Sequence, residues 1–195
     1  MAPEREDSEL IAAVRSGDRS AFGELVGRYQ QVAFRAAYLI TRDAGAAEEA
    51  AQDGFIRAFR SIGNFHADEP FRPWLLRIVT NLALNQVRSR SRRRGLLDRI
   101  GFQRLPAAEP APELEVLGSE RQRQLWAAVR ELPEEDRVVL YLRYFLELPE
   151  KEIAVVIGKA QGTVKSRLSR SGVRLRTVIE SSYPGLLPGQ GESHD

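Results

Sequence analysis

The sequence predicts an all-α protein made of two small helical domains that are joined by a flexible linker. Apolar residues recur three and four positions apart along most of the 195-residue chain, and no stretch alternates as a half-buried strand would. Between the two periodic halves, residues 95–118 contain three prolines and little periodicity. Because proline breaks the hydrogen bonding of a helix interior, this segment separates the two domains.

We expect the first domain over residues 8–94, the linker over 95–117, the second domain over 118–180 and a disordered tail over 181–195. The first domain is expected to hold helices at residues 22–40, 46–62 and 74–92, with an aromatic-rich loop before the third. The second is expected to hold helices at residues 119–132, 134–145, 149–157 and 161–180. Either domain is long enough to bury an apolar core.

The last two of these helices have the pattern of a helix-turn-helix, in which Gly158 separates a short apolar helix from a strongly basic one. At about 100° per residue, one side of the second helix gathers Val164, Leu168, Ser171 and Leu175, which suit a core. The opposite side gathers Lys165, Ser166, Ser169, Arg170 and Val173, with Arg167 and Arg174 on a flank. Since the second helix of this motif enters the major groove of DNA, its polar side is predicted to read base edges.

The composition and the distribution of charge exclude several kinds of site and segment. The formal net charge of +2 hides an uneven distribution, because five arginines crowd into residues 88–94 while residues 4–9 are acidic. The absence of cysteine excludes disulfides and thiolate zinc sites, and the two histidines are far apart in sequence. The N-terminus lacks the apolar core of a signal peptide, and no apolar run approaches the ~20 residues that span a bilayer. We expect a cytoplasmic protein with no metal, no cofactor and no segment inserted in a membrane.

Motifs in both halves resemble those of bacterial extracytoplasmic-function (ECF) sigma factors, the small two-domain class of RNA polymerase specificity subunits. The first half carries GDRSAFGELVGRYQ, AEEAAQDGFIRAFRSIGNF and FRPWLLRIVTNLALN, and the second carries LPEEDRVVLYLRYFLELPEKEIA and GTVKSRLSR. The resemblance covers residues 10–94 and 117–176. It implies a bundle like sigma region 2, followed by a helix-turn-helix domain like sigma region 4.

This resemblance implies an alternative sigma factor that binds the clamp and flap regions of core RNA polymerase and directs promoter-specific transcription initiation. The first domain would open the −10 element and capture one of its unpaired bases, and the second would read the −35 element as a duplex. The resemblance also implies an anti-sigma factor that covers both domains until a signal arrives. It implies no catalytic residue, because the nucleotide chemistry belongs to the polymerase.

By the same resemblance, the polymerase-binding surface lies at Glu48, Glu49, Gln52, Asp53 and Phe55. An acidic helix face would meet a basic partner, and such complementarity sets register and on-rate. The apolar anchors of this helix are expected at Phe55, Ile56 and Phe59. Alanine stands where the family has Asp or bulkier apolar residues, at Ala46, Ala50 and Ala51. Gly54 is also unusual, because glycine costs a helix interior about 1 kcal/mol relative to alanine.

The resemblance places the −10 base between the loop Phe65–Phe71 and the helix that follows it. Asn81 would face the base, because an amide can both donate to and accept from a base edge. Polar residues at spacings of four and three on this helix form a stripe that suits a single strand. The residues assigned to −10 binding are Phe65, Arg77, Asn81, Asn85 and Arg88. Phe71 and Trp74 are expected in the core.

Binding of the −35 element is assigned to Lys165, Ser166, Arg167, Ser169, Arg170 and Arg174. Arg170 or Lys165 could pair with guanine O6 and N7, at about 1–3 kcal/mol of discrimination for each good contact. Arg167, Arg174 and Arg143 are expected at phosphates, which position a protein without specifying sequence.

Three other functions fit the sequence less well. A helix-turn-helix regulator could act on duplex DNA without polymerase docking, but the first domain lacks the strands of a receiver. A DNA-processing enzyme would need a nucleophile among arginines or a carboxylate cluster for Mg²⁺, and no such pattern surrounds Glu48, Glu49 and Asp53. A purely protein-binding adapter is disfavoured by the basic helix. We therefore expect no enzyme activity.

Overall fold

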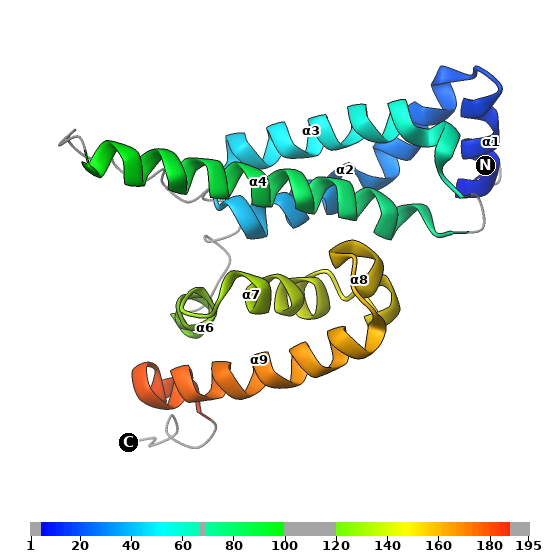
Figure 1. Cartoon of the computed structure of the whole chain (residues 1–195). Coiled ribbons are helices and arrows are strands. Elements are labelled where there is room, and N and C mark those ends of the chain that lie inside the picture. Colours follow the sequence, from blue (N-terminus) through cyan, green and yellow to red (C-terminus); the bar gives the residue numbers. More distant parts are fainter. Residues whose placement is uncertain (1–4, 67–68, 100–119, 188–195) are drawn as a thin grey trace. The chain divides into compact units, whose positions relative to one another are not determined.

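The computed structural model describes residues 5–66, 69–99 and 120–187, which form helices and turns and no strand (Figure 1). These helices fall into two units, one built around α1 to α4 and the other around α6, α7, the first part of α8, and α9. Each unit buries apolar side chains of its own. The predicted all-α architecture of two helical domains is confirmed.

The first unit is a bundle of α1 (Asp7–Arg15), α2 (Arg19–Thr41), α3 (Ala44–Ser61) and α4 (Phe71–Arg99), with a 3₁₀ turn, η1 (Ile62–Asn64), after α3. Helices α2, α3 and α4 pack pairwise against one another, and α1 packs on α2 (Figure 1). Leu25 of α2 and Leu75 of α4 are fully buried in this bundle. Their helices each bury one side, as the three-and-four spacing of the sequence predicts.

Two aspartates begin the helices α2 and α3. Asp18 accepts a hydrogen bond from the backbone N–H of Ser20 at 2.9 Å, and Asp43 accepts one from the N–H of Ala46 at 2.8 Å. Each carboxylate satisfies an N–H group that has no partner within its helix. The hydrogen bond from Ala46, together with the nearby Arg90, holds the pKa of Asp43 below its usual value.

Helix α1 is a correction to the sequence analysis, which assigns no helix to the start of the chain. The helix begins with a capping box between Glu6 and Glu9 and buries Leu10, Ile11 and Val14. With only nine residues, it offers too few turns for a periodic pattern to stand out. The acidic run of the sequence supplies the N-cap residue Glu6 and the first-turn residues Asp7 and Glu9 of this helix.

Helix α4 is longer than predicted at both ends. It begins at Phe71 rather than at residue 74, and it continues to Arg99, so residues 95–99 are helical although they were assigned to the linker. The rest of the predicted linker (100–117) and the end of the predicted tail (188–195) lie outside the described residues.

The second unit contains α6 (Glu120–Arg130), α7 (Glu134–Leu140), α8 (Glu150–Ile157) and α9 (Gln161–Ser182), with a π-helical turn, η2 (Tyr141–Phe145), after α7 and a 3₁₀ turn, η3 (Pro184–Leu186), after α9. The single helix predicted over 134–145 is therefore α7 followed by η2. At the end of η2, the N–H of Leu146 donates to the carbonyl of Tyr141, five residues back, at 3.1 Å.

The turn between α8 and α9 forms as predicted, at Gly158. This glycine has a φ of 64°, in the left-handed region that favours glycine. Its N–H donates to the carbonyl of Val155 at 3.3 Å, and the N–H of Lys159 donates to that of Ala154 at 3.0 Å. These two bonds form a Schellman motif, which ends α8 and starts the approach to α9.

The segment after α9 differs from the disordered tail predicted from residue 181. Helix α9 continues to Ser182, and η3 follows it. The Tyr183 hydroxyl donates to Glu131 Oε1 at 2.9 Å, and Arg121 Nη2 donates to the carbonyl of Leu186 at 3.2 Å. These contacts tie the segment to α6, which its Gly- and Pro-rich composition does not reveal.

The described ranges show neither a helix that could span a membrane nor a group of metal-ligating side chains. No helix within residues 5–66, 69–99 and 120–187 combines the length and the apolar character that crossing a membrane would require. In the same ranges, no three metal-ligating side chains gather into a group that could hold an ion.

Helices α3 and α4 approach each other closely at Gly54. A Cβ atom at this position would lie 2.5 Å from Val79 Cγ2, well inside van der Waals contact. Gly54 is therefore required by packing, and the close approach it allows offsets its cost of about 1 kcal/mol in a helix interior.

We expect Gly54→Ala to lower the free energy of unfolding by about 1–3 kcal/mol, because overpacking against Val79 outweighs the gain in helix propensity. The double variant Gly54→Ala/Val79→Ala should lose less stability than the sum of its two single variants, since each change relieves the other. Urea denaturation followed by circular dichroism measures both effects. An unchanged or higher stability of Gly54→Ala alone would contradict the close approach.

Candidate functional site

The outer face of α4 carries the polar stripe that the sequence predicts. Arg77, Asn81, Asn85 and Arg88 are all exposed. On the opposite side of the helix, residues such as Val79 are fully buried. Four of the five side chains assigned to −10 binding therefore lie along one accessible face, where a single strand could run past them.

The fifth, Phe65, is a correction, because its side chain belongs to the core. It is only 4% exposed, and its ring centroid lies 4.7 Å from that of Trp74 and 5.9 Å from that of Phe71. Phe71 in turn lies 5.4 Å from the ring of Tyr29 on α2. Phe65 therefore packs with the predicted core residue Phe71 and with Trp74, which is half-buried.

The arginine cluster at the end of α4 divides between exposed and paired side chains. Arg90 Nη1 lies 3.1 Å from Asp43 Oδ2, so this guanidinium ties α4 to the start of α3. Arg92 is exposed, and the side chains of Arg93 and Arg94 lie outside the described residues.

The outer face of α3 carries the four polar residues predicted for polymerase binding. Glu48, Glu49, Gln52 and Asp53 are all exposed, and Gln52 donates to Glu48 Oε1 at 3.2 Å. Their carboxylates give this face a negative charge.

Phe55 does not belong to this outer face. It is 8% exposed, and its ring packs edge-to-face on Phe22 of α2, with centroids 6.4 Å apart. Of the three predicted core anchors, Phe55 is thus buried, whereas Ile56 and Phe59 are 49% and 39% exposed, although the Phe59 ring lies 5.0 Å from that of Phe22. Ile56 lies one helical turn beyond Gln52 and Asp53, and Phe59 lies about one turn further, so the acidic face continues into an apolar one. With three apolar residues so close together, the sequence does not reveal which one points inward.

The outer face of α9 matches the wheel. Lys165, Ser166, Ser169 and Arg170 are exposed, and the Nε of Arg170 donates to the carbonyl of Ser166 at 3.2 Å. Val164, next to the first of them, is fully buried. This helix can therefore pack on its unit and still present donors and acceptors to a groove.

Arg167 and Arg174, which were predicted at phosphates, form ion pairs with α7. Arg167 Nη1 donates to Glu135 Oε2, and Arg174 Nη1 donates to Asp136 Oδ2. The Asp136 side chain is only 6% exposed, so it depends on this partner. The hydrogen bond from Arg167 holds the pKa of Glu135 below its usual value. Glu135 precedes Arg167 by 32 residues and Asp136 precedes Arg174 by 38, so no local spacing reveals these pairs.

Arg143, also predicted at a phosphate, has a similar role inside the unit. Its Nη1 donates to the carbonyl of Leu148 at 3.1 Å, just before α8 begins. Three arginines that the sequence assigned to DNA backbone therefore hold the helix-turn-helix to its own unit.

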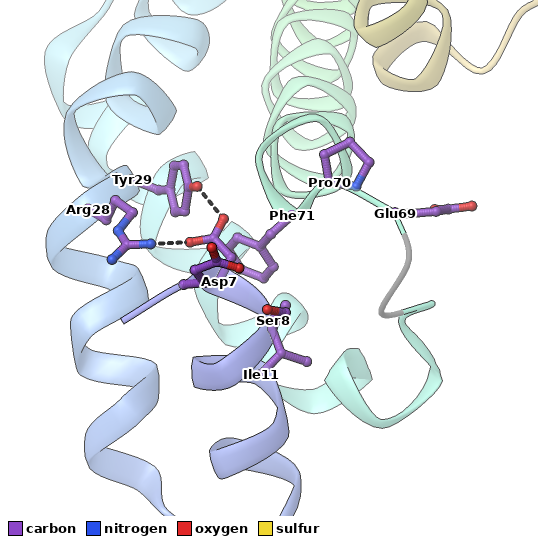
Figure 2. Close-up of a pocket in the computed structure, with 9 residues that line it drawn as sticks. Asp7, Ser8, Ile11, Arg28, Tyr29, Glu69, Pro70 and Phe71 are labelled. Carbon is purple, nitrogen blue, oxygen red and sulfur yellow. Dashed lines mark hydrogen bonds and ion pairs between the residues drawn. The ribbon is translucent and has the colours of Figure 1, made fainter. Parts of the chain in front are cut away.

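Sequence reasoning missed a pocket of about 410 Å³ where α1, α2 and the start of α4 meet (Figure 2). Asp7 lies at its centre and accepts hydrogen bonds from Arg28 and from the hydroxyl of Tyr29. Burial, and then the hydrogen bond to Asp7, raises the pKa of Tyr29 far above its usual value. Glu69 and Phe71 also line this pocket, which therefore lies between α1, α2 and the residues at the start of α4.

Comparisons with known proteins match both units. Residues 25–93 match the family model of Sigma-70 region 2, and residues 122–175 match that of Sigma-70, region 4. The chain is 35% identical over 195 residues to the RNA polymerase sigma-H factor of Pseudomonas aeruginosa, with 96% of this chain and 98% of that protein covered. It is 30% identical over 176 residues to the ECF RNA polymerase sigma factor SigW of Bacillus subtilis, with 87% and 94% covered.

Solved structures with the same fold include CnrH in complex with the cytosolic domain of CnrY, at a TM-score of 0.68 and 26% identity over 90% of this chain and 98% of that one. They also include the sigma factor RpoE in complex with the anti-sigma factor NepR from Bartonella quintana. Its TM-score is 0.63 and its identity is 25%, with 83% of this chain and 98% of that one covered. The chain belongs to the ECF family of RNA polymerase sigma factors, and it is an alternative sigma factor that directs promoter-specific transcription.

Proposed function

We propose that the three outer faces divide the work of initiation among them: α3 docks on core RNA polymerase, α4 holds the melted −10 strand, and α9 reads the −35 duplex. The observation that carries this assignment is that α4 and α9 each keep a polar exposed face opposite a buried one, in units that match regions 2 and 4. The domains of this assignment are the two units, with boundaries near residues 8–99 and 120–187 in the described chain.

For the −10 element, we assign Asn81 to the edge of the unpaired base and Arg77, Asn85 and Arg88 to the strand beside it. An amide offers both a donor and an acceptor, which suits a Watson–Crick edge. Guanidinium groups at both ends of the stripe suit the phosphates that run past it. The backbone of residues 65–66 and 69–71 forms the neighbouring wall.

For the −35 element, we assign Lys165 and Arg170 to base edges and Ser166 and Ser169 to either bases or phosphates. Arginine can bond bidentately to guanine O6 and N7, which gives it discrimination that a point charge lacks. Arg167 and Arg174 hold the helix to α7 and support the contact indirectly.

For the partners, we assign the clamp of core RNA polymerase to the outer face of α3, because acidic residues and exposed Ile56 together suit a basic, partly apolar helix. The flap would meet the second unit. CnrH and RpoE were solved in complexes, the second of them with an anti-sigma factor, which supports an anti-sigma partner for this chain.

We propose further that the chain works in the cytoplasm, where promoters and polymerase are, and that it catalyses no reaction itself. A helix-turn-helix regulator that acts without polymerase is not supported, because the first unit matches sigma region 2.

We expect run-off transcription with core RNA polymerase and genomic promoter fragments to give specific starts with this chain. Asn81→Ala and Arg170→Ala should each weaken these starts about tenfold, because each removes one base contact of about 1–3 kcal/mol. Arg35→Ala removes an exposed arginine on α2 and serves as the matched control, with starts unchanged. A duplex shift that needs no polymerase, with no transcripts, would contradict the proposal.

Arg170→Ala and Arg174→Ala should have different effects on holoenzyme binding to a −35 duplex. Arg170→Ala should weaken the cognate duplex and relax the preference for one base. Arg174→Ala should leave the slope of log affinity against log salt unchanged, whereas loss of a phosphate contact would lower it by about one unit.

The same Arg174→Ala change should lower the free energy of unfolding by about 1–3 kcal/mol, because it leaves Asp136 buried without its partner. Adding Asp136→Asn should restore part of that stability, since no uncompensated charge then remains. A reduced salt slope together with unchanged stability would instead show that Arg174 contacts a DNA phosphate.

A further inference from the structure

Arg15, the last residue of α1, holds the backbone that leads into the segment before α4. Its Nε donates to the carbonyl of Ile62 at 3.0 Å, and its Nη2 donates to the carbonyl of Phe65. These acceptors lie 47 and 50 residues further along the chain. Because the guanidinium is a planar fork, it fixes the two carbonyls relative to each other as well as to α1.

The first residues of α1 and the last residues of the same segment line one pocket. Asp7 and Ile11 line the pocket together with Glu69, Pro70 and Phe71 (Figure 2). The Asp7 carboxylate is itself fixed by two hydrogen bonds from α2. Helix α1 therefore holds the backbone at residues 62 and 65, and it lines a pocket together with residues 69–71.

Side chains anchor the same two points from the side of α4. The buried ring of Phe65 packs on Trp74, and Phe71 is 1% exposed. The rings of Phe65 and Phe71 are thus both in the core, and Arg15 holds the backbone carbonyl of Phe65. The Ile62 carbonyl also accepts a hydrogen bond from the N–H of Phe65 in the turn of η1, at 3.3 Å.

We infer that Arg15 is a positioning residue for −10 recognition, acting on the wall beside the polar stripe of α4 and not on DNA. The inference rests on the proposed function of that stripe. A wall that is already ordered removes the entropic cost of ordering it when a strand binds. Loss of the fork would leave the strand contacts in place but make the bound arrangement less populated.

The test uses the holoenzyme and a fluorescent single-stranded oligonucleotide that carries the −10 sequence of a promoter mapped by run-off transcription. Arg15→Ala should weaken binding of this strand by about tenfold, the order expected from losing two ordering hydrogen bonds. The salt slope should stay that of the unaltered protein, because no phosphate contact is lost. Arg15→Lys, which keeps the charge but not the fork, should stay weakened.

Arg19→Ala is the matched control, because it removes an exposed arginine at the start of α2. Its strand affinity and its affinity for core polymerase should both be unchanged. Affinity for core polymerase should also be unchanged in Arg15→Ala, while hydrogen exchange at residues 62–66 should speed up locally.

Three results would overturn the inference. Unchanged strand affinity in Arg15→Ala would show that these hydrogen bonds of Arg15 are dispensable. A slope lower by about 0.7 with recovery in Arg15→Lys would make Arg15 a phosphate contact. A parallel loss of core-polymerase binding would make its role merely structural. Failure of the unaltered holoenzyme to bind the strand would instead count against the proposed function of α4.

Discussion

The helices α4 and α9 each have to bury one side in a small core while the other side stays polar and exposed. In α9 the fully buried Val164 and the exposed Lys165 are neighbours, so about 100° of rotation separates the core from the exposed polar face. A modest roll of either helix about its axis would turn a residue of the exposed polar face toward the core. The orientation of these two helices is therefore what the rest of each unit has to fix.

Apolar packing fixes that orientation loosely, because it is non-directional and roughly proportional to buried area. Directional contacts supply the rest. Helix α9 is tied to α7 by the ion pairs of Arg167 and Arg174, and α4 is tied to the start of α3 by Arg90 and Asp43. All of these ties use guanidinium groups, whose fixed fork sets an angle as well as a distance. Arg90, Arg167 and Arg174 therefore serve the internal geometry of the units.

The sequence predicts the parts of this arrangement that depend on local spacing. The two faces of α9, the Gly158 turn and the stripe from Arg77 to Arg88 all follow from the helical period, and the structure has them in those places. Contacts between residues distant in sequence could not be predicted. Asp136 lies 38 residues before Arg174, so nothing local distinguishes that arginine from one that contacts phosphate. Adjacent apolar residues posed a second difficulty, since Phe55 and Ile56 differ in burial by rotation alone.

The small residues of α3 show how a departure from the family pattern can leave a surface intact. Ala46, Ala50 and Ala51 are at most 7% exposed, and Gly54 is buried against Val79. None of them lies on the outer face that carries Glu49, so their effect falls on the distance between helices. Gly54 lets α4 approach closely, in a contact with Val79 that no larger residue permits. The unusual sequence of α3 is thus a property of the core that supports α4, and the proposed docking face keeps its acidic residues unchanged.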